Sequence, residues 1–451
     1  MEYYGFLHFT VNTFTDREWG YGDEDPAVFA PHQFEALAIA SLCRAAGMAG
    51  LILTAKHHDG FCLWPSRHTA HSVRSSPYRG GRGDVVGELA AACRQVGLGF
   101  GVYLSPWDRH HPEYGREAYL DYYRNQLVEL STEYGPLFEI WFDGANGGDG
   151  YYGGARTERR IDRSTYYRWP EVHQLVRRLQ PDAIMFSDAG PDCRWVGNER
   201  GYGAETNWAC LRLAGMYPGG DYGQRLANGD PDGTHWVPAE ADVSIRPGWF
   251  YHAGEDAQVK SLAALLEIYY QSVGCGCNLL LNVPPDPRGR IHPVDAQRLL
   301  DFRRALDATF GVDLARGATV VADSVRGQAR VPGGDPAYAP AHLVDERADT
   351  CWATDDGVTT AEAVLSLPAA RALDRVRVEE YIELGQRVEA FGVDAWVGGG
   401  WAPLAAGTTI GPRRILRTPR VRTDRIRLRI TASRACPVLR RVGLFAAGEA
   451  G

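Results

Sequence analysis

The sequence lacks any run of about 18 consecutive apolar residues, which is the length that a helix needs to cross a lipid bilayer. It also lacks an excess of positive charge, because 48 Lys and Arg stand against 56 Asp and Glu and leave a formal net charge of −8. A chain of that sign does not attract the phosphates of a nucleic acid. These two absences argue against a membrane span and against a nucleic-acid partner.

A secretory leader is also missing from the first residues. A signal peptide has a basic segment followed by an apolar one, whereas Met1-Glu2-Tyr3-Tyr4 is acidic and runs directly into a strand-like segment. We therefore expect a cytoplasmic protein. Secretion or a periplasmic location stays open if the natural chain begins further upstream.

The cysteines do not show the paired spacing of a disulfide framework. Cys275-Gly276-Cys277 is a closely spaced pair that invites a metal or redox interpretation, but no second pair of matching spacing accompanies it. It also lies directly before the apolar run 278–281, which favours packing. We expect reduced, buried thiols at all nine positions: Cys43, Cys62, Cys93, Cys193, Cys210, Cys275, Cys277, Cys351 and Cys436.

What is present is the composition of a globular protein, with 45% hydrophobic and 23% charged residues over a length that predicts two domains. Up to residue 312, short apolar runs alternate with segments of helical periodicity, a pattern that indicates βαβ units and a parallel sheet. We expect residues 1–312 to form a (β/α)8-like TIM barrel. The segment 189–256 is irregular, so the sixth and seventh strands cannot be placed in it. Helices are expected at 86–97, 116–134, 169–180, 257–273 and 294–310.

The pattern of apolar residues changes near residues 311–315. Helical spacing disappears, and short β-branched runs separated by turn residues take its place, as in 318–321, 376–378, 393–397 and 425–430. This pattern is typical of an antiparallel sandwich. We expect residues 313–451 to form an all-β sandwich domain.

The most informative feature of the first domain is that five of its apolar runs end in polar residues. In a parallel barrel the carboxyl ends of all strands meet at one rim, where the chemistry of such enzymes takes place. The five clusters therefore predict a site at that rim. They end at His8, at His57 and His58, at Tyr103 and Trp107, at Asp143, and at Asp188.

The residues of this rim favour carbohydrate chemistry. Asp143 follows Trp141-Phe142 at a strand end, where it suits a nucleophile or a general acid/base, and a turn aspartate is the alternative. Hydrolysis of a glycoside usually needs a second carboxylate, and the residues alone do not rank Glu199, Glu240 and Asp188. The sequence has 12 Trp, whose rings stack on the apolar faces of sugars. Seven of them fall near expected rim loops: Trp64, Trp107, Trp141, Trp195, Trp208, Trp236 and Trp249.

Two other interpretations remain open on these residues. The histidines His8, His57 and His58 could hold a catalytic metal together with Asp143, but carboxylate ligands are few and the first strand has no His-x-His pair. We expect no metal. The barrel could also be a lectin without catalysis, although the presence of two well-placed carboxylates argues for an enzyme.

Seven ordered motifs resemble the α-L-fucosidases of glycoside hydrolase family 29, and they are closest to the branch that acts on α-1,3/1,4-linked fucose. They cover residues 8 to about 293 as HFTVNTFTDREWG, LTAKHHDGFCLWPS, GVYLSPWDRH, WFDGA, PDCRWVGNE, SIRPGWFYH and NLLLNVPP. The tail resembles the β-domain of that branch, and its segment 345–354 is similar to discoidin-like carbohydrate-binding modules.

The resemblance implies a retaining exo-α-L-fucosidase that needs no cofactor and removes terminal fucose from fucosylated, Lewis-type oligosaccharides. It implies that Asp143 is the nucleophile and Glu199 the acid/base, with Glu240 as the alternative because the other branch places this residue differently. The segment 144–168 is longer than is usual for the branch, which we expect to affect the leaving-group side. The implied sugar-binding residues are His8, Glu18, Trp19, His57, His58, Tyr103, Trp107, Trp141 and Trp249.

Overall fold

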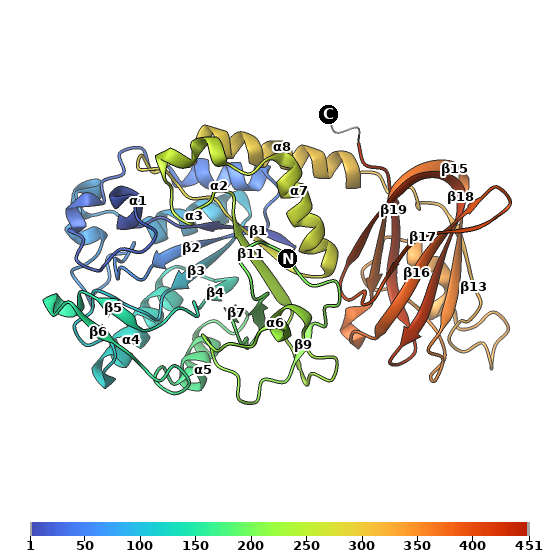
Figure 1. The fold of residues 1–451 in the computed structure, drawn as a ribbon, viewed down its shortest axis with the longest axis horizontal. Helices are drawn as coiled ribbons and strands as arrows, with labels where there is room; N and C mark the ends of the chain where they lie inside the picture. The colour runs from blue at the N-terminus through green and yellow to red at the C-terminus, as the bar shows by residue number, and fades with distance from the viewer. Residues whose placement is uncertain (1, 449–451) are drawn as a thin grey trace.

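The computed structural model describes residues 2–448, which form two domains joined end to end (Figure 1). The first domain is a closed barrel of eight parallel strands, in the order β1-β12-β11-β8-β7-β4-β3-β2. The fold class predicted from the sequence is confirmed. The barrel strands are β1 (Tyr3–Leu7), β2 (Gly50–Lys56), β3 (Gly99–Leu104), β4 (Glu139–Trp141), β7 (Ile184–Ser187), β8 (Cys193–Trp195), β11 (Ala239–Ser244) and β12 (Asn278–Asn282).

The barrel interior is filled by aromatic side chains from alternate strand positions, as expected for a barrel of this size. Phe6, Tyr103 and Trp141 belong to this buried cluster, and the Phe6 and Trp141 rings lie 5.2 Å apart. This cluster fills the interior of the barrel beneath the carboxyl ends of the strands.

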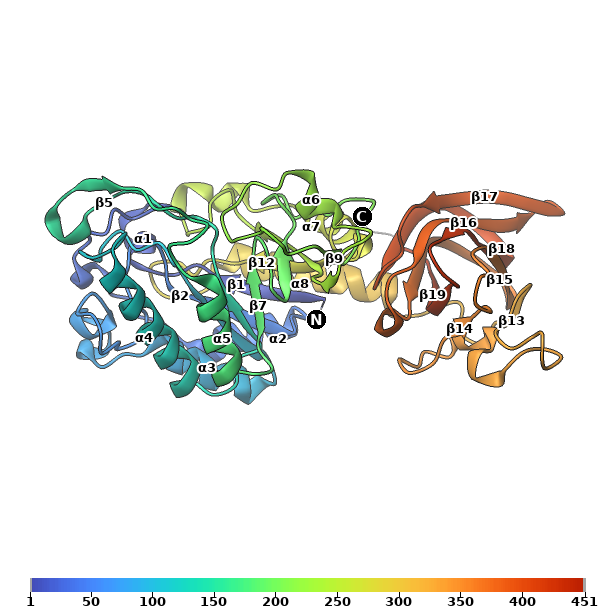
Figure 2. The same ribbon diagram turned by 90° about the horizontal axis from the view of Figure 1, so that it is seen from below.

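Helices cover the outside of the barrel (Figure 2), and five of them match the expected segments within a few residues. The largest difference is the helix expected to begin at residue 257, which begins at Leu262 because the Ser261 side chain caps it by accepting from the Ala264 amide. The helices are α1 (Val11–Thr15), α2 (Ala36–Ala45), α3 (Val85–Val96), α4 (Glu117–Glu133), α5 (Trp169–Leu179), α6 (Gln224–Asn228), α7 (Leu262–Gln271) and α8 (Pro293–Phe310). Among residues 2–448, none of the helices combines the length and the apolar character that spanning a bilayer requires.

The second domain is one antiparallel sheet, with the strand order β14-β19-β15-β18-β16-β17 and β13 paired to β15. Its two 20-residue strands, β15 and β18, change register between Ser366 and Arg371 and arch over, so that the sheet folds around a second core (Figure 1). The strands are β13 (Thr319–Ala322), β14 (Trp352–Ala353), β15 (Ala361–Glu380), β16 (Val388–Val397), β17 (Gly400–Gly407), β18 (Arg414–Ser433) and β19 (Val438–Phe445). The expected domain boundary at 312/313 lies in the connection between α8 and β13.

The long segment 144–168 forms a hairpin of β5 (Gly148–Gly150) and β6 (Thr157–Arg159) at the end of the barrel farthest from the second domain (Figure 2). Arg109 holds it by donating to the Asp149 carbonyl at 2.8 Å and to the Asp149 carboxylate at 3.0 Å. A second small ribbon pairs β9 (Cys210–Leu211) with β10 (His235–Trp236). All nine cysteines are free; seven are buried, while Cys210 and Cys275 are partly exposed.

Candidate active site

A pocket of about 220 Å³ opens at the carboxyl ends of the barrel strands. Nine of the sequence-predicted site residues line it, and they come from segments as distant as 8–19 and 249. The nine are His8, Glu18, Trp19, His57, His58, Trp141, Asp143, Glu199 and Trp249, and the other lining residues are Phe6, Gly144, Ala145, Asp188, Trp195 and Asp242.

Asp143 follows β4 directly, and its carboxylate is held from two sides. Tyr103 donates its hydroxyl hydrogen to Oδ2 at 2.9 Å, and the Ala145 amide donates to Oδ1 at 2.7 Å. Burial raises the pKa of Asp143, while these two hydrogen bonds act in the opposite direction. The carboxylate is therefore fixed in orientation and only partly exposed, which suits a nucleophile.

The three histidines of the pocket are neutral. Burial lowers the pKa of His8 and of His58 to about 3, and it also holds the pKa of His57 well below its usual value. His8 Nδ1 lies 2.9 Å from Asn282 Oδ1, and His58 Nδ1 lies 2.7 Å from the Ser105 hydroxyl. His58 Nε2 lies 3.8 Å from Asp143, and because the ring is neutral this contact is not an ion pair.

Glu199 stands at the mouth of the pocket on the loop that follows β8. Its Oε2 accepts the Trp249 indole N–H at 3.3 Å. Partial burial and the charges of Asp143 and Glu18 raise the pKa of Glu199, while the bond from Trp249 lowers it. The residue remains exposed, so water screens these effects. It can carry a proton at a higher pH than an ordinary glutamate.

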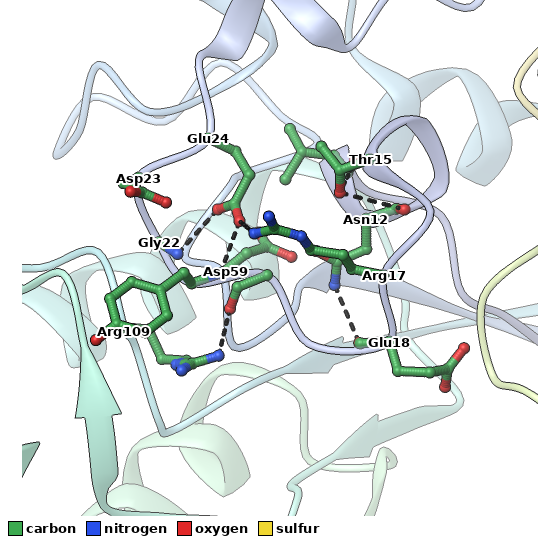
Figure 3. Close-up of polar contacts among 12 residues, drawn as sticks. Asn12, Thr15, Arg17, Glu18, Gly22, Asp23, Glu24, Asp59 and Arg109 are labelled. Atoms are coloured by element: carbon green, nitrogen blue, oxygen red, sulfur yellow. Dashed lines mark hydrogen bonds and ion pairs between the residues drawn. The ribbon is translucent and has the colours of Figure 1, made fainter.

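The loop that carries Glu18 and Trp19 is fixed from below by a buried polar cluster (Figure 3). Asn12 Nδ2 donates to the Glu18 carbonyl at 3.2 Å, and Arg109 Nη1 donates to the Gly20 carbonyl at 2.6 Å. The Glu24 carboxylate accepts the amides of Tyr21 and Gly22. The Glu18 side chain points away from this cluster (Figure 3).

Two further acidic residues line the pocket: Asp188, which was one of the three unranked candidates for the second carboxylate, and Asp242, which the sequence did not identify. Asp188 lines the pocket beside Asp143, and burial together with the Asp143 charge raises its pKa to about 7. Asp242 accepts the Trp195 indole N–H at 2.8 Å. It lies two positions beyond Glu240 on β11, so both face the barrel interior and Asp242 is nearer the rim. That two-residue period is the signal that identifies it.

Three predicted residues do not line the pocket. Tyr103 is fully buried and reaches Asp143 only through its hydroxyl, and Trp107 lies behind Trp19, with ring centroids 5.4 Å apart. Glu240 is 0% exposed; it accepts the Trp141 indole N–H at 2.8 Å and a hydrogen bond from Tyr4. A carboxylate enclosed in this way cannot reach a leaving group.

Of the seven tryptophans predicted near the rim, some line the pocket and others do not. Trp141, Trp195 and Trp249 line the pocket. Trp64 is instead buried in the barrel core, where its indole donates to Glu129 at 2.8 Å, and Trp236 lies exposed on the β9–β10 ribbon. Proximity to a predicted loop did not distinguish these environments.

The arrangement as a whole suits a single neutral sugar. The pocket combines indole walls for the apolar face of a ring, neutral imidazoles for hydroxyl groups, and carboxylates of different exposure for proton and bond chemistry. No group of three or more His, Cys, Asp or Glu in residues 2–448 has the arrangement needed to hold a metal ion.

Comparisons with known proteins agree with this site. The family model for α-L-fucosidase matches residues 3–308. The α-L-fucosidase 1 of Arabidopsis thaliana is 40% identical over 444 residues, which cover 98% of this chain and 84% of the relative.

Solved structures of glycoside hydrolase family 29 are also similar to this chain. A glycoside hydrolase 29 family member from an unknown rumen bacterium is 43% identical with a TM-score of 0.88, over 100% of this chain and 76% of that one. A family 29 fucosidase of Ruminococcus gnavus in complex with fucose is 31% identical with a TM-score of 0.87, over 99% and 93% of the two chains. The chain therefore belongs to the α-L-fucosidases of glycoside hydrolase family 29.

Proposed function

We propose that the protein is a retaining exo-α-L-fucosidase that releases terminal α-1,3/1,4-linked L-fucose from Lewis-type oligosaccharides. The observation that carries this proposal is the pairing of Asp143 and Glu199 in one pocket of about 220 Å³, a space suited to a single sugar ring. The fucose complex of the Ruminococcus gnavus relative supports fucose as that sugar.

The chemistry requires the two carboxylates to differ. In the first step Asp143 attacks the anomeric carbon as the bond to the leaving oxygen breaks, and the proton of Glu199 passes to that oxygen. In the second step the Glu199 carboxylate takes a proton from water, the hydroxide oxygen bonds to the anomeric carbon, and the ester to Asp143 breaks. The raised pKa of Glu199 supports its starting role as the acid.

The remaining residues would bind the sugar and position the nucleophile. His8, His57, His58 and Glu18 face the pocket with groups that pair with hydroxyls, while Trp19, Trp141 and Trp249 supply apolar walls. Tyr103 orients Asp143, and Trp107 supports Trp19 from behind. The linkage preference rests on the resemblance of the motifs to one branch of the family.

Chemical rescue tests the two catalytic roles. Asp143→Gly and Glu199→Ala should both lose release of fucose from a Lewis trisaccharide, and azide should restore reaction with an activated fucoside. Rescue of the Asp143 variant should give the β-azide and rescue of the Glu199 variant the α-azide. If wild type and Asp143→Gly release fucose equally slowly, the protein is a fucose-binding lectin instead. Comparison of α-1,2- with α-1,3- and α-1,4-linked substrates tests the linkage.

A further inference from the structure

A continuous line of hydrogen bonds leads from outside the pocket to Glu199. It begins at Asp16, passes through His252 to Glu18, continues through the main chain of Trp249, and ends with the Trp249 indole on Glu199. Asp16 and His252 do not line the pocket themselves. They contact residues that do.

The Glu18 carboxylate is the centre of this line. Its Oε2 accepts the Trp249 amide at 2.8 Å, and its Oε1 accepts the Phe250 amide at 3.0 Å and lies 2.7 Å from His252 Nε2. Three donors from the segment 249–252 thus converge on one side chain of the loop after β1. Glu18 holds that segment in place while it still faces the sugar pocket.

His252 is itself held at both ring nitrogens. Nε2 faces Glu18, and Nδ1 lies 2.6 Å from the Asp16 carboxylate. Only a doubly protonated ring donates to two carboxylates at once. Burial lowers the pKa of His252, but the hydrogen bonds to Asp16 and Glu18 and the nearby Glu255 charge outweigh it, so the pKa is raised.

The segment that Glu18 holds has little freedom to shift. A Cβ on Gly248 would lie 2.5 Å from Glu18 Oε1, so the main chain passes directly against the carboxylate. The opposite side of Glu18 is fixed as well, because Asn12 holds its carbonyl (Figure 3). The direction of the Glu18 side chain is then set by the Trp249 and Phe250 amides together with His252, which is the side chain that bonds to the Glu18 carboxylate.

We propose that His252 is a positioning residue that, with Asp16, directs the Glu18 carboxylate and through it places the Trp249 indole against Glu199. The inference builds on the proposed function, in which Glu18 and Trp249 contact fucose and Glu199 is the acid/base. It adds that sugar affinity and the geometry of the acid/base are coupled through one side chain outside the pocket.

Substitution of His252 by two amides separates this role from simple packing. In His252→Gln the amide nitrogen can stand where Nε2 stands and still donate to Glu18, whereas in His252→Asn it can reach only the position of Nδ1 and Asp16. Titration calorimetry with L-fucose should show a Kd within about threefold of wild type for His252→Gln, and about 10- to 100-fold weaker binding for His252→Asn and His252→Phe, the weight of one hydrogen bond to a charged group. The KM for a Lewis trisaccharide should follow the Kd.

Gly248→Ala displaces Glu18 from the other side and should reproduce the weak binding of His252→Asn even if His252→Phe fails to fold. His68→Gln is the matched control, because His68 Nε2 also lies near a carboxylate, 3.6 Å from Glu129 Oε1, and neither residue lines the pocket; it should bind fucose as wild type does. Wild-type affinity in His252→Asn, or equal loss in the Gln and Asn variants, would overturn the proposal. Absence of fucose binding and release in the wild-type protein would instead refute the proposed function itself.

Discussion

At the scale of single residues, the Trp249 indole lowers the pKa of the Glu199 carboxyl group, against other effects that raise it. Glu199 receives the Trp249 N–H, and it faces the acidic side chains of Asp143, Glu18 and Asp242. The three carboxyl groups favour the protonated form when they are ionised, whereas the indole favours the carboxylate. The pKa of Glu199 therefore reflects opposing effects, and a single substitution that removes one of them should shift it.

Trp249→Phe removes the indole N–H and keeps an aromatic ring. Because a bond that stabilises the carboxylate is lost, the pKa of Glu199 should rise, and the alkaline limb of the kcat/KM profile should move to higher pH. Trp141→Phe is the control, since that indole donates to Glu240 rather than to Glu199. A limb that moves to lower pH, or moves equally in both variants, would contradict the assignment of Glu199 as the acid.

Gly144 gives a second prediction at this scale. A Cβ at this position would lie 2.0 Å from Asp188 Oδ2, so the residue after Asp143 must be glycine for the two acidic side chains to sit side by side. Gly144→Ala should lower kcat/KM about 100-fold by displacing Asp143 or Asp188, and lower the stability by about 1–3 kcal/mol.

The double variant Gly144→Ala/Asp188→Ala separates these effects, because it removes the atoms that the new methyl group meets. Thermal unfolding should show that the double variant regains most of the stability lost in Gly144→Ala. If the melting temperature does not recover, the clash lies elsewhere.

At the scale of elements, the sequence predicted the strands that belong to clear apolar runs and missed β8 and β11. β2 and β3 are buried almost throughout and consist largely of apolar residues. β8 has three residues, and its buried Arg194 donates to the carbonyls of Leu226 and Trp208. β11 carries Glu240 and Asp242 at buried positions. Periodicity cannot reveal strands whose buried residues are charged and satisfied by distant partners, whether these residues face the barrel interior, as Glu240 does, or its outside, as Arg194 does.

The same limit applied to the site. The motifs placed Asp143, Glu199 and the histidines at one rim, because the carboxyl ends of parallel strands converge there. They could not show that Glu240 faces the closed interior, or that Trp107 lies behind Trp19. The first fact depends on the placement and face of β11, and the second on how the loops of Trp19 and Trp107 pack; both are decided by contacts between segments far apart in the chain.

The β5–β6 hairpin belongs to this scale because it supports the Trp19 wall indirectly. Tyr152, which follows β5, accepts the Trp107 indole N–H at 3.1 Å, and Trp107 in turn packs its ring against Trp19. Trp19 itself is 54% exposed, so much of its support comes from that contact.

Replacing residues 150–157 by Asn-Gly should keep the hairpin closed, since this pair forms a tight turn, while it removes Tyr152. We expect KM to rise about 2- to 10-fold, the effect of one aromatic contact, with kcat unchanged because Asp143 and Glu199 are untouched. Steady-state kinetics on a Lewis trisaccharide measures both. A lower kcat at constant KM would show that the hairpin acts on the chemistry instead.

At the scale of the whole molecule, the second domain contacts the barrel segment that follows the acid/base loop in the chain. Gln386 bonds to the main chain of Asn207 and Ala209, and Arg414 donates to the Glu205 carbonyl at 2.9 Å. These barrel residues follow the loop of Glu199 within ten positions. Ile415 of β18 packs into the hydrophobic core of the barrel, and Phe445 contacts Phe310 at the end of α8.

An interface of this kind should make the two domains unfold together, and two isoleucine variants test it. Ile415→Ala removes the side chain that enters the barrel core, whereas Ile410→Ala makes a cavity inside the second domain alone. Each should cost about 2–5 kcal/mol. In calorimetry both variants should keep one transition at a lower temperature, because the shared interface couples the unfolding of the two domains. Two separated transitions in Ile410→Ala would show instead that the barrel unfolds independently of the second domain.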